Sequence, residues 1–248
     1  MYIDNDYLYI EPKDNAKTDK KISVRNFCGL LGLDNFKKEG DYLLLSWGLI
    51  KDEVDEKWQK RGDFAEAIVF KVYQRDGHKP IRYNKKEIHY DNFLGEHKWL
   101  SGMIDIELPD ERSLVEVKSK NLEKYDFICR RIPQFELYQG ITYGYLRNYD
   151  IIYMEYIFFD DETEQEIFAG KKPTTLQYLK RYPKKVYVNR QEMESKIEYV
   201  ENLLNKYKET MKISLDLISD KTLNSLGFKR PIKPKIVIDD SWFPMKEE

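Results

Sequence analysis

The chain has 248 residues, which suits one well-buried domain with a small appended part and is too short for two independent enzymes. Hydrophobic residues make up 41% of it, enough for a globular core, and the net charge of −2 provides no overall basic field for nucleic acid. The isolated Cys28 and Cys129 argue against a disulfide framework or a metal–cysteine site, while an acidic N-terminus broken by Pro12 and the lack of a long apolar run predict a soluble, cytoplasmic protein with no membrane contact.

Helical and extended patterns alternate along the chain, which predicts an α/β domain without repeats. The first expected helix carries Ser23 as its N-cap and Gly32 at its end. The expected helices cover residues 22–33, 52–75 and 133–147. The expected strands cover residues 79–91, 98–108, 113–120 and 150–160, and an acidic tip at 160–166 follows the last of them.

The C-terminal part contains a basic segment, a long helix and a tail. Residues 171–190 are expected to form a basic connector, and Asn189 with Glu192 resembles a capping box for the helix that follows. The tail from Lys229 holds three prolines and is expected to run as an irregular arm. We therefore treat 1–248 as a single domain, with a core at about 22–160, the connector at 171–190, and the helix and arm at 190–248.

Two opposite charges interrupt the apolar strand at 113–121, SLVEVKSKN. Successive side chains of a strand point to opposite faces, so Glu116 and Lys118 share one face while Val115 and Val117 occupy the other. A buried ion pair contributes little to stability inside a sheet. These charges therefore indicate a reaction site.

A further carboxylate is expected beside this strand. The even positions of residues 100–108 are mostly apolar, which puts Asp105 on the opposite face. A short turn joins this run to the next strand, so the two are expected to pair as a hairpin in which Asp105 faces Glu116.

Two helices bring polar side chains towards the same region. Glu66 lies on a helix that is apolar around most of its circumference, and Gln139 and Tyr143 are four residues apart on one helix face. Structural readings stay open for two of them: Glu66 as the partner of an arginine, and Gln139 as an ordinary polar residue of the helix.

Carboxylates close together would repel and take up protons unless a cation joins them. Mg²⁺ or Mn²⁺ prefers such oxygen ligands. Lys118 would supply positive charge to an attacking hydroxide and a phosphorane. One metal-activated water and one fixed cation are what hydrolysis of a phosphodiester requires.

Asp105 followed by Glu116-Val117-Lys118 resembles the D…ExK signature of the PD-(D/E)xK nuclease superfamily. Gly62 with Glu66 on the preceding helix, and Gln139 with Tyr143 on the following one, make the chain similar to RecB-type nucleases and to the phage lambda exonuclease group. The resemblance covers 22–147 and implies a restriction-endonuclease-like fold: a central mixed β-sheet flanked by helices, with a C-terminal helix and an irregular tail.

The resemblance also implies roles for individual residues. Asp105, Glu116 and the backbone carbonyl of Val117 would hold the metal, and Glu66 would reach it directly or through water. Lys118 would orient or help deprotonate the attacking water. Gln139 would position Lys118 or the substrate phosphate, with Tyr143 on the same face.

Contacts with DNA are expected from basic side chains and from one helix start. Ser23 and Arg25 stand where the family binds a terminal 5′-phosphate, although Arg25 replaces the usual serine. The connector holds seven Lys or Arg and no acid, with tyrosines interleaved, which suits a phosphate backbone; a solvated connector is the alternative. The basic candidates are Lys120, Arg130, Arg131, Lys180 and Arg181.

The expected function is a Mg²⁺- or Mn²⁺-dependent DNA exonuclease that degrades duplex ends from the 5′ side and passes the remaining strand to a single-strand annealing protein. By resemblance the oligomer would be a ring trimer, and a phage-encoded protein would act in the host cytoplasm. The alternatives are a structure-specific or single-strand endonuclease or exonuclease, and a catalytically silent DNA-binding module. The intact Asp105, Glu116 and Lys118 argue against the silent module.

Overall fold

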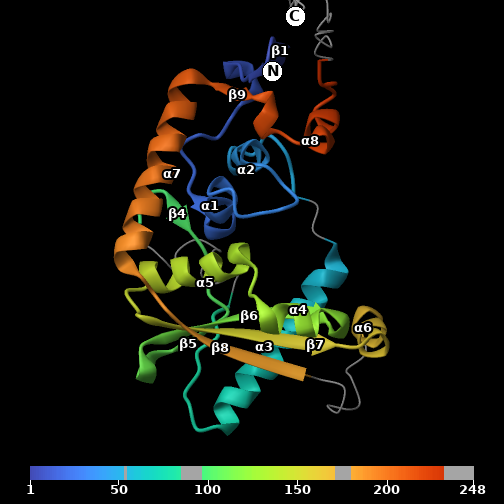
Figure 1. The fold of residues 1–248 in the computed structure, drawn as a ribbon, viewed down its shortest axis with the longest axis vertical. Coiled ribbons are helices and arrows are strands. Elements are labelled where there is room, and N and C mark those ends of the chain that lie inside the picture. The colour runs from blue at the N-terminus through green and yellow to red at the C-terminus, as the bar shows by residue number, and fades with distance from the viewer. Residues whose placement is uncertain (53–54, 85–96, 171–179, 232–248) are drawn as a thin grey trace, which may run out of the picture.

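The largest sheet is built on the two long apolar runs of the sequence. The computed structural model describes residues 1–52, 55–84, 97–170 and 180–231 (Figure 1). The strands of this sheet are β5 (Ile106–Leu108), β6 (Ser113–Asn121), β7 (Ile151–Phe159) and β8 (Lys180–Tyr187). Their order is β5-β6-β7-β8, with β6 and β7 parallel and both outer pairs antiparallel, so the sheet is mixed.

Helices cover both faces of this sheet (Figure 1). On one face α5 (Gln134–Leu146) packs against β6 and β7, and Leu114 joins the larger apolar core there. On the other face α3 (Glu56–Arg75) packs against β6, α6 (Asp161–Phe168) packs against α3, and Val115 and Val117 join the second apolar core there. The alternation expected for this strand is therefore confirmed, because the two valines and Leu114 belong to different cores.

A second layer, mostly helical, adjoins the α5 side. It contains α1 (Val24–Leu30), α2 (Glu39–Ser46), α7 (Arg190–Thr210) and α8 (Asp220–Ser225). Two small sheets join distant parts of the chain: β1 (Tyr2–Asp4), β2 (Tyr7–Tyr9) and β9 (Lys212–Ser214) in one, β3 (Ile22–Ser23) and β4 (Leu100–Ser101) in the other. Because β9 pairs with β2, the segment after α7 packs beside the N-terminus.

Short elements complete the described chain. Helix α4 (Tyr125–Arg130) follows β6 closely. Single 3₁₀ turns occur at Pro12–Asp14, Pro109–Glu111, Leu122–Lys124 and Leu215–Leu217.

The expected fold class is confirmed, as are the helix caps at Ser23 and Asn189, whose side chains accept from the N–H groups of Asn26 and Glu192. The buried stripe of α7 is also as expected. Residues 232–248, which hold most of the predicted arm, lie outside the described residues.

Three expectations about strands are wrong. The run 98–108 is not one strand: β4 and β5 belong to different sheets, and the chain leaves the ladder between them where Asp105 accepts a hydrogen bond from the Val117 N–H. The part of 79–91 that the structure describes contributes only a bridge between Ile81 and Glu107. The supposed connector contains β8, because its alternating tyrosines and lysines pair with β7; residues 171–179 lie outside the described residues.

Four of the described helices were not expected, namely α2, α4, α6 and α8. The acidic tip is α6, which begins at a cap where Asp160 accepts from the Thr163 N–H over 2.8 Å and whose first turn is acidic, as the helix dipole favours. Helix α2 has an apolar run that carries little helical periodicity.

One buried carboxylate, Glu107 of β5, belongs to the packing. It accepts hydrogen bonds from Arg147, Tyr149 and Tyr83, a set we call the Glu107 cluster. Burial opposes its charge, but these hydrogen bonds outweigh burial and lower the pKa of Glu107.

Candidate active site

The β5–β6 hairpin places two carboxylates side by side. Ile106 pairs with Val115, so the next position along each strand brings Asp105 opposite Glu116, as the sequence predicts. Asp105 Oδ2 accepts a hydrogen bond of 2.7 Å from the Val117 N–H. The Val117 peptide thus binds Asp105 and stands between Glu116 and Lys118 in the strand.

Lys118 and Gln139 complete this group from β6 and α5. Lys118 Nζ donates to Glu116 Oε1 over 2.6 Å and to Gln139 Oε1 over 2.9 Å. The helix can approach because position 140 is glycine: a Cβ there would lie 2.7 Å from Met154 Sδ and 3.5 Å from Glu116 Cβ. A side chain at position 140 would require Met154 to move, or α5 with Gln139 to shift away from the sheet.

The charges of this group strongly influence one another. Burial raises the pKa of Glu116 despite the nearby Lys118. Burial, Glu116 and Glu66 raise the pKa of Asp105 well above its usual range. Burial alone would lower the pKa of Lys118, but Glu116 and Asp105 raise it to about 12, so Lys118 carries a proton at neutral pH.

One oxygen of Glu116 is left without a partner. The residue is only 3% exposed, and Oε2 is buried with no hydrogen bond in the described structure. A buried acceptor without a donor is costly, and a cation would satisfy it.

The oxygen donors present fit a hard divalent cation. Among the described residues no three His, Cys, Asp or Glu side chains form a group that could by itself hold a metal ion. Asp105, Glu116 and the Val117 carbonyl are all oxygen donors, the type that Mg²⁺ and Mn²⁺ prefer, with waters completing the coordination. The orphaned Glu116 Oε2 makes the fit specific to this place.

Glu66 lies on α3, close enough for its charge to raise the pKa of both Asp105 and Glu116. Its Oε2 accepts from Arg82 over 2.6 Å. The structural reading of Glu66 as an arginine partner is therefore correct in this structure, and a metal-ligand role remains a prediction.

Tyr143 supports the site from behind. Gln139 Nε2 lies 3.4 Å from its hydroxyl, and the side chain is buried in the core. Burial and the charge of Glu116 raise the pKa of Tyr143 well above its usual range. A position this deep holds Gln139 in place and does not offer a DNA-facing surface.

The basic candidates divide between the two faces of the sheet. Lys120 and Lys180 both align with Phe158 and share the face of Lys118; Lys120 pairs with Glu136, and the Lys180 ammonium lies 4.5 Å from the Tyr125 ring centroid. Arg130 and Arg131 are exposed at the end of α4.

Arg181 lies on the opposite face of the sheet. It makes two hydrogen bonds, of 2.8 and 2.6 Å, to the fully buried Glu155, which also accepts from the Tyr73 hydroxyl. Arg181 is thus committed to a buried ion pair beside α3 and is not brought to the candidate site.

Helix α1 passes beside the candidate site. The buried Cys28 lies close enough to Lys118 and Glu116 for their charges to act on its pKa, which burial raises. Ser23 caps this helix through the Asn26 N–H, and Arg25 pairs with Asp52 over 2.7 Å. Neither Ser23 nor Arg25 contacts Asp105 or Glu116.

Sequence reasoning missed several partners of these charges. Glu136 accepts from both Lys120 and Tyr156, and Arg61 donates to Ser119 and Glu164. A signal existed for Glu155, because a lone carboxylate inside the run IIYMEYIFF requires a buried partner.

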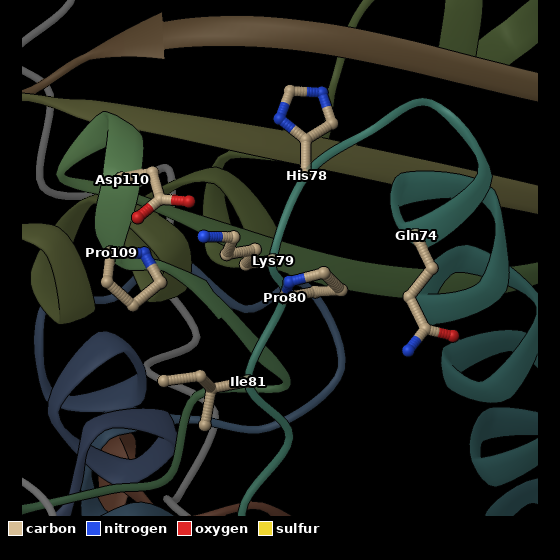
Figure 2. A pocket seen from close by; sticks show the side chains of 7 residues that line it. All are labelled: Gln74, His78, Lys79, Pro80, Ile81, Pro109 and Asp110. Atoms are coloured by element: carbon tan, nitrogen blue, oxygen red, sulfur yellow. The ribbon is translucent and has the colours of Figure 1, made fainter.

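A hollow of about 680 Å³ lies away from this group, at the other end of β5 (Figure 2). The hairpin turn with Pro109 and Asp110 faces the segment from His78 to Ile81 that leaves α3. His78 Nδ1 lies 2.7 Å from Glu111. Among the described residues that line this hollow, Asp110 is the only carboxylate, so the hollow offers no chemistry comparable to that of Asp105 and Glu116.

Comparisons with known proteins identify the fold. No family model matches the chain, and neither does any curated protein. Within the described residues, no helix is long and apolar enough to cross a membrane.

Solved structures do match. An alkaline exonuclease (LHK-Exo) from Laribacter hongkongensis matches over 88% of this chain and 98% of its own, with a TM-score of 0.53 and 9% identity. A phage related exonuclease from Haemophilus somnus 129PT matches over 75% and 92%, with a TM-score of 0.52 and 12% identity. LHK-Exo in complex with dAMP matches over 81% and 92%, with a TM-score of 0.50 and 11% identity. The chain shares the restriction-endonuclease-like fold of these exonucleases.

Proposed function

We propose that this chain is a divalent-metal-dependent deoxyribonuclease that hydrolyses phosphodiester bonds from the ends of duplex DNA in the 5′-to-3′ direction. The observation that carries the proposal is the assembly of Asp105, Glu116 and Lys118 around a buried carboxylate oxygen that has no partner. The exonuclease names of the structural neighbours, one of them bound to dAMP, support it.

Asp105, Glu116 and the Val117 carbonyl would hold Mg²⁺ or Mn²⁺, with Glu66 released from Arg82 or acting through water. The cation would supply positive charge to the phosphate and acidity to a water molecule. Once the cation is bound, Asp105 and Glu116 would stay ionised, because the attraction of each carboxylate to the cation outweighs the repulsion between the two carboxylates.

Lys118 would act as a fixed cation. Its pKa of about 12 favours donation of hydrogen bonds to the attacking water and a phosphate oxygen over removal of a proton from water. Gln139 would hold the ammonium in place through the 2.9 Å hydrogen bond, while Tyr143 holds Gln139.

DNA would approach the sheet face that carries Lys118. Lys120 and Lys180 lie on that face, and Arg130 and Arg131 are exposed at the nearby end of α4. These contacts suit a phosphate backbone and not base edges, so we expect cleavage that depends on DNA ends and not on sequence. A single-strand annealing protein would receive the product, and a ring of three copies would retain the DNA.

A hydrolysis assay tests the proposal. Linear duplexes labelled at the 5′ or 3′ end, closed circles and single strands are incubated with Mg²⁺ or with EDTA. We expect linear duplex to lose nucleotides from the 5′ end only with Mg²⁺. Circles cut as fast as linear duplex would instead indicate an endonuclease, and full activity in EDTA would refute the metal site.

A further inference from the structure

A second groove of about 920 Å³ lies between α2, α8 and the start of α3. In Figure 1 these elements belong to the helical layer and to the chain that descends from it to the sheet. The groove combines exposed aromatic rings with basic side chains, of which only Arg25 has an earlier expected role, as a contact of a terminal 5′-phosphate. The residues that matter here are Arg25, Phe36, Lys37, Lys51, Trp58 and Lys221.

The two aromatic rings are unusually accessible. Phe36 is 92% exposed and Trp58 is 44% exposed. The Trp58 ring is held in place, because the Arg61 guanidinium lies 4.5 Å from its centroid and Phe168 meets it edge-on. A fixed, half-exposed indole is a surface on which a base can stack.

The floor of the groove already holds one anion, the carboxylate of Asp52. Asp52 lies 2.7 Å from Arg25 Nη1 and 2.5 Å from Lys37 Nζ. An oxyanion between two cations has the chemistry of a phosphate contact. Asp52 thus occupies a position that a phosphate could take.

The other acids of the groove are engaged elsewhere. Asp41 is buried and accepts from the N–H groups of Lys38 and Ser219, while Asp55 caps α3 through the Lys57 N–H. The lining residues include four basic and three acidic side chains, so the charge presented to a ligand is weakly positive.

One wall of the groove adjoins the catalytic group, and the other is anchored to the sheet. Arg25 lies one helical turn before Cys28, and the charges of Lys118 and Glu116 act on the pKa of the Cys28 thiol. Trp58 stacks on Arg61, which donates to the side chain and carbonyl of Ser119. Ser119 points to the α3 face of the sheet, opposite Lys118, so this contact fixes Trp58 to the sheet, and the Arg25 side of the groove is the one that adjoins the catalytic group.

We propose that this groove binds an unpaired nucleic-acid strand of a few nucleotides, with Trp58 and Phe36 stacked on bases and the four basic residues on phosphates. The inference rests on the proposed function for the role of that strand, which is the unpaired portion of a DNA end. An acidic peptide would match the positive charge but would leave both rings unused.

The experiment measures binding of fluorescein-labelled oligothymidylate to the full chain in EDTA, where hydrolysis is off, over a series of salt concentrations. Trp58→Leu should weaken binding about 5- to 150-fold, the range for loss of one base–aromatic stack. Lys221→Ala should reduce the salt slope by about 0.7. The controls are Tyr199→Leu, which is 52% exposed on α7, and Lys13→Ala, whose side chain is 72% exposed; both should bind like the wild type.

Asp52→Asn gives a result in the opposite direction. It removes the carboxylate that competes with phosphate for Arg25 and Lys37, so affinity should rise, which damage to the fold would not produce. Unchanged binding by both Trp58→Leu and Asp52→Asn would overturn the inference, as would competition by polyglutamate at equal charge.

The two proposals fail separately. If hydrolysis depends on metal but the groove variants bind DNA like the wild type, the nuclease proposal stands and the groove proposal is refuted. If the groove variants change the affinity for DNA but the chain has no hydrolytic activity, the groove proposal stands and the nuclease proposal is refuted.

Discussion

Asp105→Asn separates the catalytic proposal from a purely structural role for the carboxylates. The asparagine keeps an oxygen for the Val117 N–H and removes the charge. Because burial, Glu116 and Glu66 raise the pKa of Asp105, its contribution to stability is present below the usual carboxylate range and is lost as the pH rises through the raised value. The free energy of unfolding of the variant at pH 8 in EDTA should therefore exceed that of the wild type by about 1–3 kcal/mol, the order of the desolvation penalty of a buried polar group.

Mg²⁺ should reverse this order. A concentration 100 times the Kd stabilises a folded protein by about 2.7 kcal/mol, and each kcal/mol raises the Tm of a chain of this size by about 2–4 °C. The wild type should thus gain about 5–11 °C. Asp105→Asn lacks a ligand, so it should gain little and should not hydrolyse DNA.

Thermal unfolding followed by tryptophan fluorescence, at pH 5 and pH 8 and with EDTA or Mg²⁺, measures both effects. Asp110→Asn, an exposed acid on the same hairpin, is the matched control and should behave like the wild type. The reasoning is refuted if Asp105→Asn is less stable than the wild type in EDTA, or if Mg²⁺ raises both unfolding temperatures equally.

Three further predictions concern single side chains. Lys118→Met should reduce hydrolysis by about 10²- to 10⁴-fold while DNA binding in EDTA persists, and equal activity in a single-turnover assay would contradict its role. Arg181→Ala leaves Glu155 buried without its cation and should lower the free energy of unfolding, measured in a urea titration, by about 3–5 kcal/mol. Lys180→Ala should leave stability unchanged and lower the salt slope of DNA binding. The opposite pattern would show that Arg181 contacts phosphate. Because the pKa of Glu107 is lowered, the stability it contributes is present above the usual carboxylate range and is lost as the pH falls. Glu107→Gln should therefore lose less stability than the wild type between neutral and acid pH. An equal loss in both proteins would show that the Glu107 cluster does not contribute.

The candidate site was largely predictable from local patterns. Alternation along β6 put Glu116 and Lys118 on one face, and the short turn before it implied the register that brings Asp105 opposite Glu116. Both inferences depend only on strand geometry and on sequence neighbours. The helix face of Gln139 followed in the same way from its four-residue spacing with Tyr143, whereas the close packing at Gly140 emerged only from the structure.

The errors concern contacts between distant segments. Strand alternation alone cannot show that β4 leaves for another sheet, since its partner is β3, far away in the sequence. Arg181 belongs to a strand whose pleat turns it towards Glu155, and that face was unknown without the pairing of β7 and β8. Glu66 and Arg82 likewise meet only after α3 and the following segment fold back on each other.

The outer strand β8 has a consequence for how copies of this chain could associate. Within the described residues it ends the sheet, and Pro183 at its middle has no N–H to donate to a further strand. Its exposed lysines, including Lys184 and Lys185, would repel the same strand of a second molecule. Backbone pairing across this edge is therefore disfavoured, so two copies that meet at β8 would contact each other through side chains and not through a continuous sheet.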